Sequence, residues 1–368
     1  MTPIRNPAVR GTRSLGVLLV VIALAGCAGA STTAPSTTAP SPTPIPSPAP
    51  AQSAAPASAS PTADTATPTA TPMPTLRTAY DLPLFGELVK LFDYDTKEQL
   101  GYKVTYEERQ EGATVSDITY ESGGYKVLAK LVIPDGKGPF PAVLYAVGLD
   151  LHPSFFLPEM VAFAKDGYAG LAIGDRAPLD LYSTLDTTID IEGYAHYVID
   201  LRRGLDLLGT LPKIDAKRIG FVGHSLGCAV GSIISGIETR IGAYALMACG
   251  GYVTDPAVSF CSTDACFSAT AEDRSAYQDR LAVLNPVNYI GRGGGAAFLL
   301  QAAKEDTIML APNVEALFAA APQPKSLKWY DYGDQNLGGH GLGCEYYGSC
   351  DPALPAFADH RAWLKLHV

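Results

Sequence analysis

The chain of 368 residues is short of positive charge. It holds 27 Lys and Arg residues against 37 Asp and Glu residues, a formal net charge of −10. The first 75 residues contain three Arg and one Asp, so the remainder has 24 basic and 36 acidic residues and a net charge of −12. An acidic domain repels a phosphate backbone. The charge balance therefore argues against a nucleic-acid partner.

The apolar run near the N-terminus lacks the length of a comfortable membrane span. It extends from Leu15 to Ala25 and follows three arginines, which is the layout of a secretory signal. It ends in Leu24-Ala25-Gly26-Cys27, which resembles a bacterial lipoprotein signal. We expect residues 1–26 to be a lipoprotein signal peptide and Cys27 to be lipidated. An ordinary signal peptide that happens to carry a cysteine is the alternative.

The next segment is almost free of charge and of large apolar side chains. Residues 28–75 are nearly all Ala, Ser, Thr and Pro, with Asp64 as the single charged residue. Such a composition buries too little to offset the entropy of ordering. We expect residues 27–75 to be a disordered tether, or an O-glycosylated stalk, that holds residues 76–368 at the outer face of a bacterial membrane.

None of the seven cysteines follows a common structural zinc spacing. Cys261 and Cys266 flank a short polar stretch, and Cys344 and Cys350 flank another. In an oxidising compartment, such short-range pairs are candidates for disulfides. We therefore expect these four residues to form two disulfides and expect no metal site.

Two further cysteines lie in apolar surroundings. Cys228 precedes a run of small apolar residues, and Cys249 ends another apolar run. We expect both to be small buried residues. A third disulfide, between these two, stays open.

The folded part shows no internal repeat, and its apolar pattern changes along the chain. Period-two segments at the start predict three antiparallel strands, and later strands alternate with helices. This alternation predicts the α/β class, with a mostly parallel central sheet covered by helices on both faces. Residues 250–290 fit no sheet element and are candidates for a small lid. The expected strands are Tyr102–Tyr106, Val115–Tyr120, Tyr125–Ile133, Pro141–Val147, Gly167–Ile173, Arg218–Val222, Ile241–Met247, Ala296–Ala302 and Ser326–Tyr330, and the expected helices are Asp81–Asp95, Phe155–Lys165, Ile191–Leu208, Asp273–Leu284 and Ala353–Leu366.

The most informative motif is Gly223-His224-Ser225-Leu226-Gly227. It follows a short apolar strand and precedes a helix of small apolar residues. A G-x-S-x-G pattern in that setting predicts a strained turn that holds the serine clear of its neighbours. We expect Ser225 to be a nucleophile, and His224 to pack or cap beside it.

A serine hydroxyl needs a base, and the base needs an orienting carboxylate. In sheets of this kind the acid and then the base follow the serine along the chain. Asp306 lies just beyond a late buried strand and is the expected acid, with Glu305 as the local alternative. His340 lies in a glycine-rich loop between the last strand and the last helix. We expect His340 to be the base, placed by a loose backbone.

The oxyanion formed by attack needs two backbone N–H donors. One is expected from Leu226, the residue after the nucleophile. The other is expected from Leu149, in the turn after the strand Pro141–Val147.

With these residues in this order, the chain resembles the α/β-hydrolase superfamily. Within it, the chain resembles the esterases similar to dienelactone hydrolase and prolyl oligopeptidase. The resemblance covers about residues 115–368 and implies the roles given above for Ser225, Asp306 and His340. The chain departs from the family pattern at Val147-Gly148, where His-Gly is frequent, and at Cys228, where a second glycine is frequent. Neither departure removes a backbone N–H donor. The serine in place of a cysteine argues against dienelactone hydrolysis itself. The resemblance is carried by the segments Pro141–Gly148, Gly167–Asp175, Gly223–Gly227, Ala303–Ile308 and Gly339–His340.

We therefore expect residues 76–368 to be the catalytic domain of an exported serine hydrolase that cleaves carboxylic esters without a metal or cofactor. Its substrate would be a small-molecule or polymeric ester. A peptidase of the prolyl-oligopeptidase type is one alternative, although the segment between the tether and the first strands is too short to build the usual propeller. A non-catalytic surface-binding protein with the same fold is another.

Overall fold

The computed structural model describes residues 76–149, 151–174, 184–254, 263–347, 350–351 and 353–368. The expected signal peptide, Cys27, the expected tether and Cys261 lie outside these residues. Within the described part of the chain, no helix combines the length and the apolar character needed to cross a membrane.

Three antiparallel strands begin the sheet, as expected. They are β1 (Lys103–Gln110), β2 (Ala113–Ser122) and β3 (Tyr125–Pro134). Two-residue turns join them, and both residues of each turn have positive φ: Glu111 with Gly112, and Gly123 with Gly124. Such turns match the twist of the strands they connect.

Six further strands run parallel to one another and complete a nine-stranded sheet in the order β1-β2-β3-β5-β4-β6-β7-β8-β9. Along the chain β4 comes before β5, but in the sheet β5 lies between β3 and β4. Strand β3 therefore pairs with β5. The expected mixed, mostly parallel sheet is confirmed. These strands are β4 (Phe140–Ala146), β5 (Ala169–Ile173), β6 (Ile214–His224), β7 (Ala243–Met247), β8 (Ala297–Ala303) and β9 (Lys325–Tyr330).

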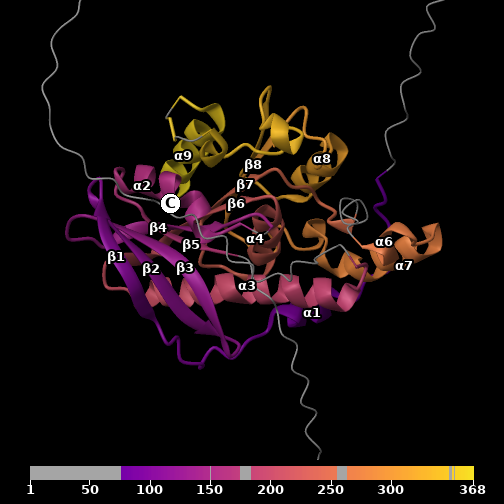
Figure 1. The fold of residues 1–368 in the computed structure, drawn as a ribbon, viewed down its shortest axis with the longest axis horizontal. Helices are drawn as coiled ribbons and strands as arrows, with labels where there is room; N and C mark the ends of the chain where they lie inside the picture. The colour runs from indigo at the N-terminus through magenta and orange to yellow at the C-terminus, as the bar shows by residue number, and fades with distance from the viewer. Residues whose placement is uncertain (1–75, 150, 175–183, 255–262, 348–349, 352) are drawn as a thin grey trace, which may run out of the picture. The chain divides into compact units, whose positions relative to one another are not determined.

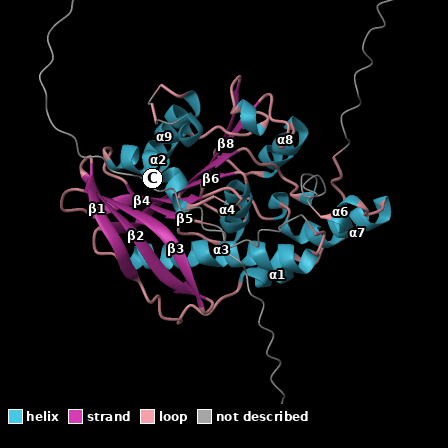
Figure 2. Cartoon of the chain, viewed as in Figure 1, coloured by secondary structure: helices cyan, strands magenta, loops and turns pink. Residues whose placement is uncertain are grey.

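Helices cover both faces of the sheet (Figures 1 and 2). The larger core cluster packs α3 and α4 against one face, and a second cluster packs α2 and α9 against the other. Strands with both faces covered are apolar throughout, as β4, β5 and β7 are. The helices are α1 (Phe85–Leu88), α2 (Leu157–Ala164), α3 (Thr187–Thr210), α4 (Leu226–Ile237), α6 (Asp264–Phe267), α7 (Ala271–Leu281), α8 (Ala311–Ala320) and α9 (Pro355–His367).

The register of the parallel strands brings their C-terminal ends to one edge. Ala146 of β4 pairs with Gly223 of β6, and Met247 of β7 pairs with His224 and with Gln301 of β8. The loops that follow these strands therefore meet at the edge where open α/β sheets bind their ligands.

Several elements differ from the sequence-based expectation. The segment Asp81–Asp95 forms only the short α1 and a 3₁₀ turn, and α8 had not been expected. Helix α7, in the expected lid segment, packs against α3, where the Tyr277 hydroxyl donates to the buried Asp190 at 2.5 Å. The middle of that segment, residues 255–262, lies outside the described residues.

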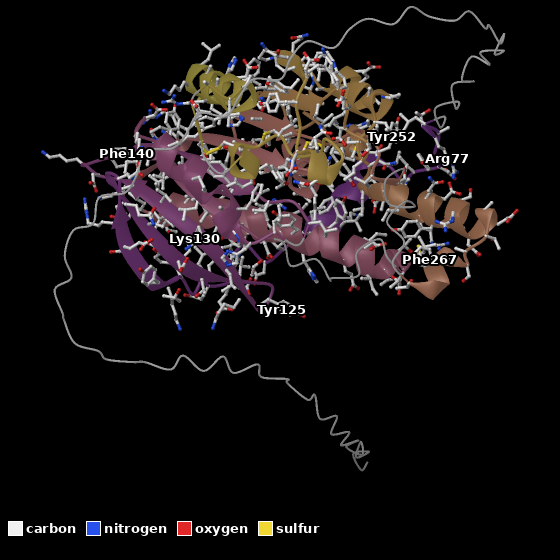
Figure 3. The ribbon with its side chains drawn as sticks, turned by 45° about the horizontal axis from the view of Figure 1, so that its top comes forward. Arg77, Tyr125, Lys130, Phe140, Tyr252 and Phe267 are labelled. Carbon is white, nitrogen blue, oxygen red and sulfur yellow. A yellow bond between two sulfur atoms is a disulfide. The ribbon has the colours of Figure 1, made fainter. Side chains whose placement is uncertain are left out.

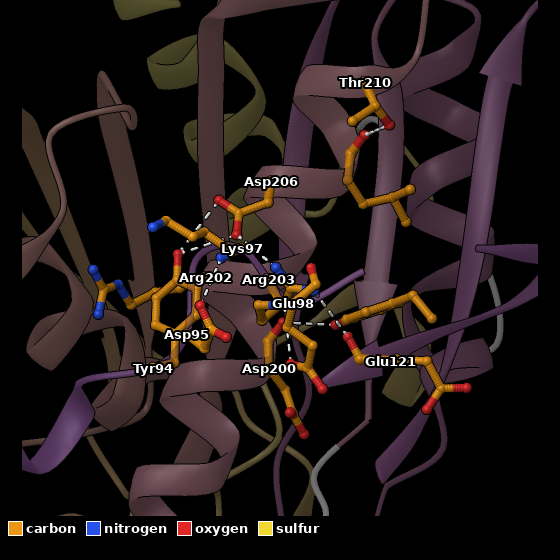
Figure 4. Close-up of polar contacts among 12 residues, drawn as sticks. Tyr94, Asp95, Lys97, Glu98, Glu121, Asp200, Arg202, Arg203, Asp206 and Thr210 are labelled. Carbon is orange, nitrogen blue, oxygen red and sulfur yellow. Dashed lines mark hydrogen bonds and ion pairs between the residues drawn. The ribbon is translucent and has the colours of Figure 1, made fainter. Parts of the chain in front are cut away.

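Ion pairs attach the first described segments to this framework. Arg77 donates to the Ser275 hydroxyl at 3.1 Å and pairs with Asp279 on α7 (Figure 3). The network in Figure 4 joins α3 to the segment before β1. Its centre is Arg203, which is 1% exposed, donates to the backbone oxygen of Glu98 at 2.8 Å and pairs with Asp206 at 3.3 Å.

Candidate active site

The sharp turn between β6 and α4 holds Ser225. This serine has φ 55° and ψ −117°, where non-glycine residues are rare. The flanking glycines leave no room for a side chain. An added Cβ on Gly223 would lie 2.4 Å from the backbone oxygen of Gly227, and one on Gly227 would lie 1.9 Å from that of Ala146. Backbone strain of this kind clusters at functional sites.

The loop after β8 holds the carboxylate of Asp306 in a fixed orientation. Its Oδ1 accepts from the backbone N–H groups of Ile308 at 2.9 Å and Met309 at 2.8 Å. Its Oδ2 lies 2.8 Å from Nδ1 of His340. The side chain of Glu305, the local alternative, is exposed.

His340 connects this carboxylate to the serine. A carboxylate can only accept, so Nδ1–H of His340 donates to Asp306 and Nε2 is left to accept. Nε2 lies 2.9 Å from Oγ of Ser225. Both His340 and Asp306 are 6% exposed. The fold thus brings the three residues named from the sequence into one chain of hydrogen bonds.

The glycines before His340 serve close packing, which corrects the expectation of a loose backbone. Gly338 and Gly339 have φ of 58° and 86°. A Cβ added to Gly339 would lie 2.7 Å from the backbone oxygen of Glu305. The Thr307 N–H donates to the backbone oxygen of Gly338 at 2.9 Å. The loops that carry Asp306 and His340 are therefore packed directly on each other.

A second histidine supports the first. His224 is 1% exposed, and its Nε2–H donates to the backbone oxygen of His340 at 3.0 Å. Its Nδ1 accepts from the hydroxyl of Tyr346 at 3.3 Å. Burial, and then the nearby His340, lower the pKa of His224 to about 3, so its ring stays neutral. The packing role expected for His224 thus takes the form of two hydrogen bonds, whereas sequence reasoning missed Tyr346.

Two disulfides flank this site. The expected bond between Cys344 and Cys350 is present and closes the loop that carries Tyr346. Cys228 and Cys249 are also bonded, which settles the alternative that the sequence left open. They are 21 residues apart, but the first turn of α4 and the end of β7 meet, with Cα atoms 5.8 Å apart. The pairing of Cys261 with Cys266 stays a prediction, because Cys261 lies outside the described residues.

Two backbone segments face the serine from either side. Leu226 is the first residue of α4, where the N–H groups have no acceptor within the helix. On the other side, Gly148 comes so near that an added Cβ would lie 3.4 Å from Cβ of Ser225, and Leu149 follows it. Both Leu226 and Leu149 line the cavity above Ser225.

This cavity, here called the Ser225 cavity, has a volume of about 300 Å³. Eleven of its sixteen lining residues are aliphatic, glycine or disulfide-bonded cysteine, and the others are tyrosines, histidines and Ser225. Among the described residues, no group of three or more His, Cys, Asp or Glu side chains is placed to hold a metal ion. The lining residues are Gly148, Leu149, Leu151, Tyr194, His224, Ser225, Leu226, Ala229, Cys249, Gly250, Val253, Ile308, Met309, Leu337, His340 and Tyr346.

No family model matches the chain. It is similar to the solved structure of acetyl xylan esterase 1 from Thermoanaerobacterium sp. JW/SL YS485, with 17% identity, a TM-score of 0.58, and coverage of 68% of this chain and 87% of that one. It is also similar to the acetyl xylan esterase from Paenibacillus sp. R4, with 17% identity, a TM-score of 0.56, and coverage of 77% and 93%. The fold is that of the α/β-hydrolases. Folds of this kind host many reactions, so the residues of the site and not the fold determine the chemistry.

Proposed function

We propose that this α/β-hydrolase cleaves carboxylic esters, with Ser225 as nucleophile, His340 as general base and Asp306 as the acid that orients His340. The observation that carries this proposal is the continuous hydrogen-bond chain, 2.9 Å from Ser225 to His340 and 2.8 Å from His340 to Asp306. A hydroxyl in contact with a neutral imidazole, itself fixed by a buried carboxylate, is the arrangement that makes serine nucleophilic.

In this mechanism Oγ of Ser225 attacks the acyl carbon as its proton moves to Nε2 of His340. The N–H groups of Leu226 and Leu149 stabilise the negative oxygen of the tetrahedral intermediate. When the intermediate collapses, the C–O bond to the alcohol breaks and His340 returns the proton to the leaving oxygen. Water, activated by His340, then attacks the acyl-enzyme and releases the acid and free Ser225.

The proposal extends to the location of the enzyme. The sequence favours export and a lipid anchor on Cys27. Two disulfides among the described residues support an oxidising compartment, because such bonds are rare in cytosolic proteins. We infer an enzyme held at the outer face of a bacterial membrane, with ester substrates reaching it from outside.

The decisive experiment is the substitution Ser225→Ala, assayed with a short-chain p-nitrophenyl ester. We expect kcat to fall at least about a thousandfold, because the nucleophile is lost while the fold stays. Ser326→Ala on β9 is the matched control and should keep full activity. A Ser225→Ala variant as active as the parent would exclude the proposed mechanism.

Two further assays separate the alternatives left by the sequence. A fluorophosphonate probe should label the parent and spare Ser225→Ala, whereas a non-catalytic binder would take no label. A p-nitroanilide with the same acyl group should be hydrolysed far more slowly than the p-nitrophenyl ester. Faster hydrolysis of the amide would make the chain a peptidase.

A further inference from the structure

The inner wall of the Ser225 cavity is built along the first turns of α4. Ala229 lies one helical turn beyond Ser225, and its backbone N–H donates to the Ser225 backbone oxygen at 3.1 Å. Residues four apart stack on the same face of a helix. Ala229 is 4% exposed, and Tyr194 of α3, at 2% exposed, lines the cavity with it. The cavity therefore extends inward from Ser225 past a very small side chain.

This inner part offers little to a polar substrate group. Besides Ala229 and Tyr194, its wall consists of Leu226, Cys249 and Val253, which are 4–6% exposed. Of the polar residues nearer the serine, His224 already uses both ring nitrogens, one with His340 and one with Tyr346. Apart from the hydroxyl of Tyr194, no side chain of this inner wall would replace the hydrogen bonds to water that a sugar hydroxyl loses here, and that loss is costly. A hydrocarbon chain has no such loss.

The geometry of proton transfer decides which half of the ester enters. His340 must return a proton to the leaving alcohol, so the alcohol lies on the side of His340. On that side the lining includes the half-buried Ile308 and the exposed Leu337, at 39%. The acyl group then lies on the opposite side, toward α4 and Tyr194. The enclosed part of the cavity thus faces the acyl group, and the open part faces the alcohol.

The volume of about 300 Å³ covers both the enclosed and the open part of the Ser225 cavity. A water-sized group takes about 30 Å³ in a liquid, so an acetyl group would fill only a small share of this space. Each methylene added inside an apolar cavity strengthens binding about fourfold. On the basis of the proposed ester hydrolysis, we propose that the Ser225 cavity binds an unbranched aliphatic acyl chain of about four to eight carbons and that Ala229 sets its depth. This substrate class differs from the acetyl esters named for the two similar structures.

The test is an acyl-length profile with p-nitrophenyl esters from acetate to dodecanoate. For the parent we expect kcat/KM to rise about fourfold per methylene from acetate and to peak between butanoate and octanoate. Ala229→Leu should move the peak toward acetate, because the larger side chain shortens the cavity. Val253→Ala should move it toward longer chains, and this second variant keeps the test valid if the first fails to fold. Ala319→Leu, on the exposed side of α8, should keep the parent profile.

The outcomes also separate this inference from the proposed function. A parent that hydrolyses acetate best and loses activity with each added carbon would overturn the acyl site while leaving ester hydrolysis in place. An unchanged peak in both Ala229→Leu and Val253→Ala would show that these residues do not set the depth of the cavity. A parent inert toward every ester and toward the fluorophosphonate would instead contradict the proposed function.

Discussion

His224 supports the site through a neighbour and not through contact with the reacting bond. It is buried, neutral and bonded to the backbone of His340 on one side and to Tyr346 on the other. The sequence places it inside the serine motif, but nothing in a single chain indicates which backbone oxygen it reaches. At the scale of single residues, His224 is therefore a positioning residue for His340.

His224→Phe should keep a planar aromatic ring at this position and remove both hydrogen bonds. We expect kcat to fall about tenfold, the equivalent of one hydrogen bond, with KM nearly unchanged. His224→Gln offers an N–H near the position of Nε2 and should recover part of the loss. Steady-state kinetics with one ester check this. Equal loss in the Phe and Gln variants would show that packing alone matters.

The same residue links stability to pH. The folded protein keeps His224 neutral down to a pKa of about 3, whereas the unfolded chain takes up its proton near 6.5. Between these values the unfolded state binds more protons, so the free energy of unfolding decreases as the pH falls, by up to about 1.4 kcal/mol per pH unit. Urea unfolding from pH 7 to pH 4 should show this slope, and His224→Phe should flatten it. An unchanged slope would contradict the assignment.

Among the elements, α4 is joined to the loop after β7 by the disulfide between Cys228 and Cys249. The chain between these residues contains most of α4 and all of β7, so the bond closes a loop that includes both elements. Cys249 also lines the Ser225 cavity. The bond therefore fixes both the direction of α4 and one part of the inner wall of the Ser225 cavity.

Replacing both Cys228 and Cys249 by Ala should lower the free energy of unfolding by about 3 kcal/mol, as expected for a loop of 21 residues. The matched control replaces Cys344 and Cys350, whose loop spans only 6 residues, and should cost about 2 kcal/mol. Chemical denaturation of both variants measures the difference. The reverse order of the two losses would show that loop length does not govern these bonds.

Most elements follow from apolar patterning, and the exceptions have physical causes. Buried strands such as β4 and β7 read as continuous apolar runs, so their positions were predictable. Helix α8 was missed, although Pro312 at its start, with Val314 and Leu317 three residues apart, is a usable signal. The order β3-β5-β4 and the pairing of distant cysteines depend on tertiary contacts that one sequence does not reveal.

The candidate site, like the fold, was predictable only in part. Ser225, Asp306 and His340 could be named in advance, because a strained turn and the order of the loops leave a signature in the sequence. The glycines before His340 were visible, but their purpose was not. Their need for glycine comes from contact with Glu305 and Thr307 on another loop, which only the folded chain brings together.

For the molecule as a whole, the proposed anchor predicts where the enzyme is found. Cys27→Ser removes the expected site of lipidation. We expect the parent in the membrane fraction of a bacterial host and the variant in the soluble exported fraction, with equal specific activity, because the domain itself is unchanged. Fractionation followed by the ester assay measures both. A parent found entirely in the soluble fraction would refute the anchor.

In an anchored enzyme, the arginine contacts near the N-terminal side of the domain would resist mechanical force. Any pull on the tether would first load Arg77 against α7, and then the bonds from Arg202 to the backbone of Phe92 and from Arg203 to that of Glu98. In each contact one partner precedes β1 along the chain, so in an anchored enzyme these contacts would bear the pull before β1 does. They would carry the force before it reached the strands that align Ser225, Asp306 and His340.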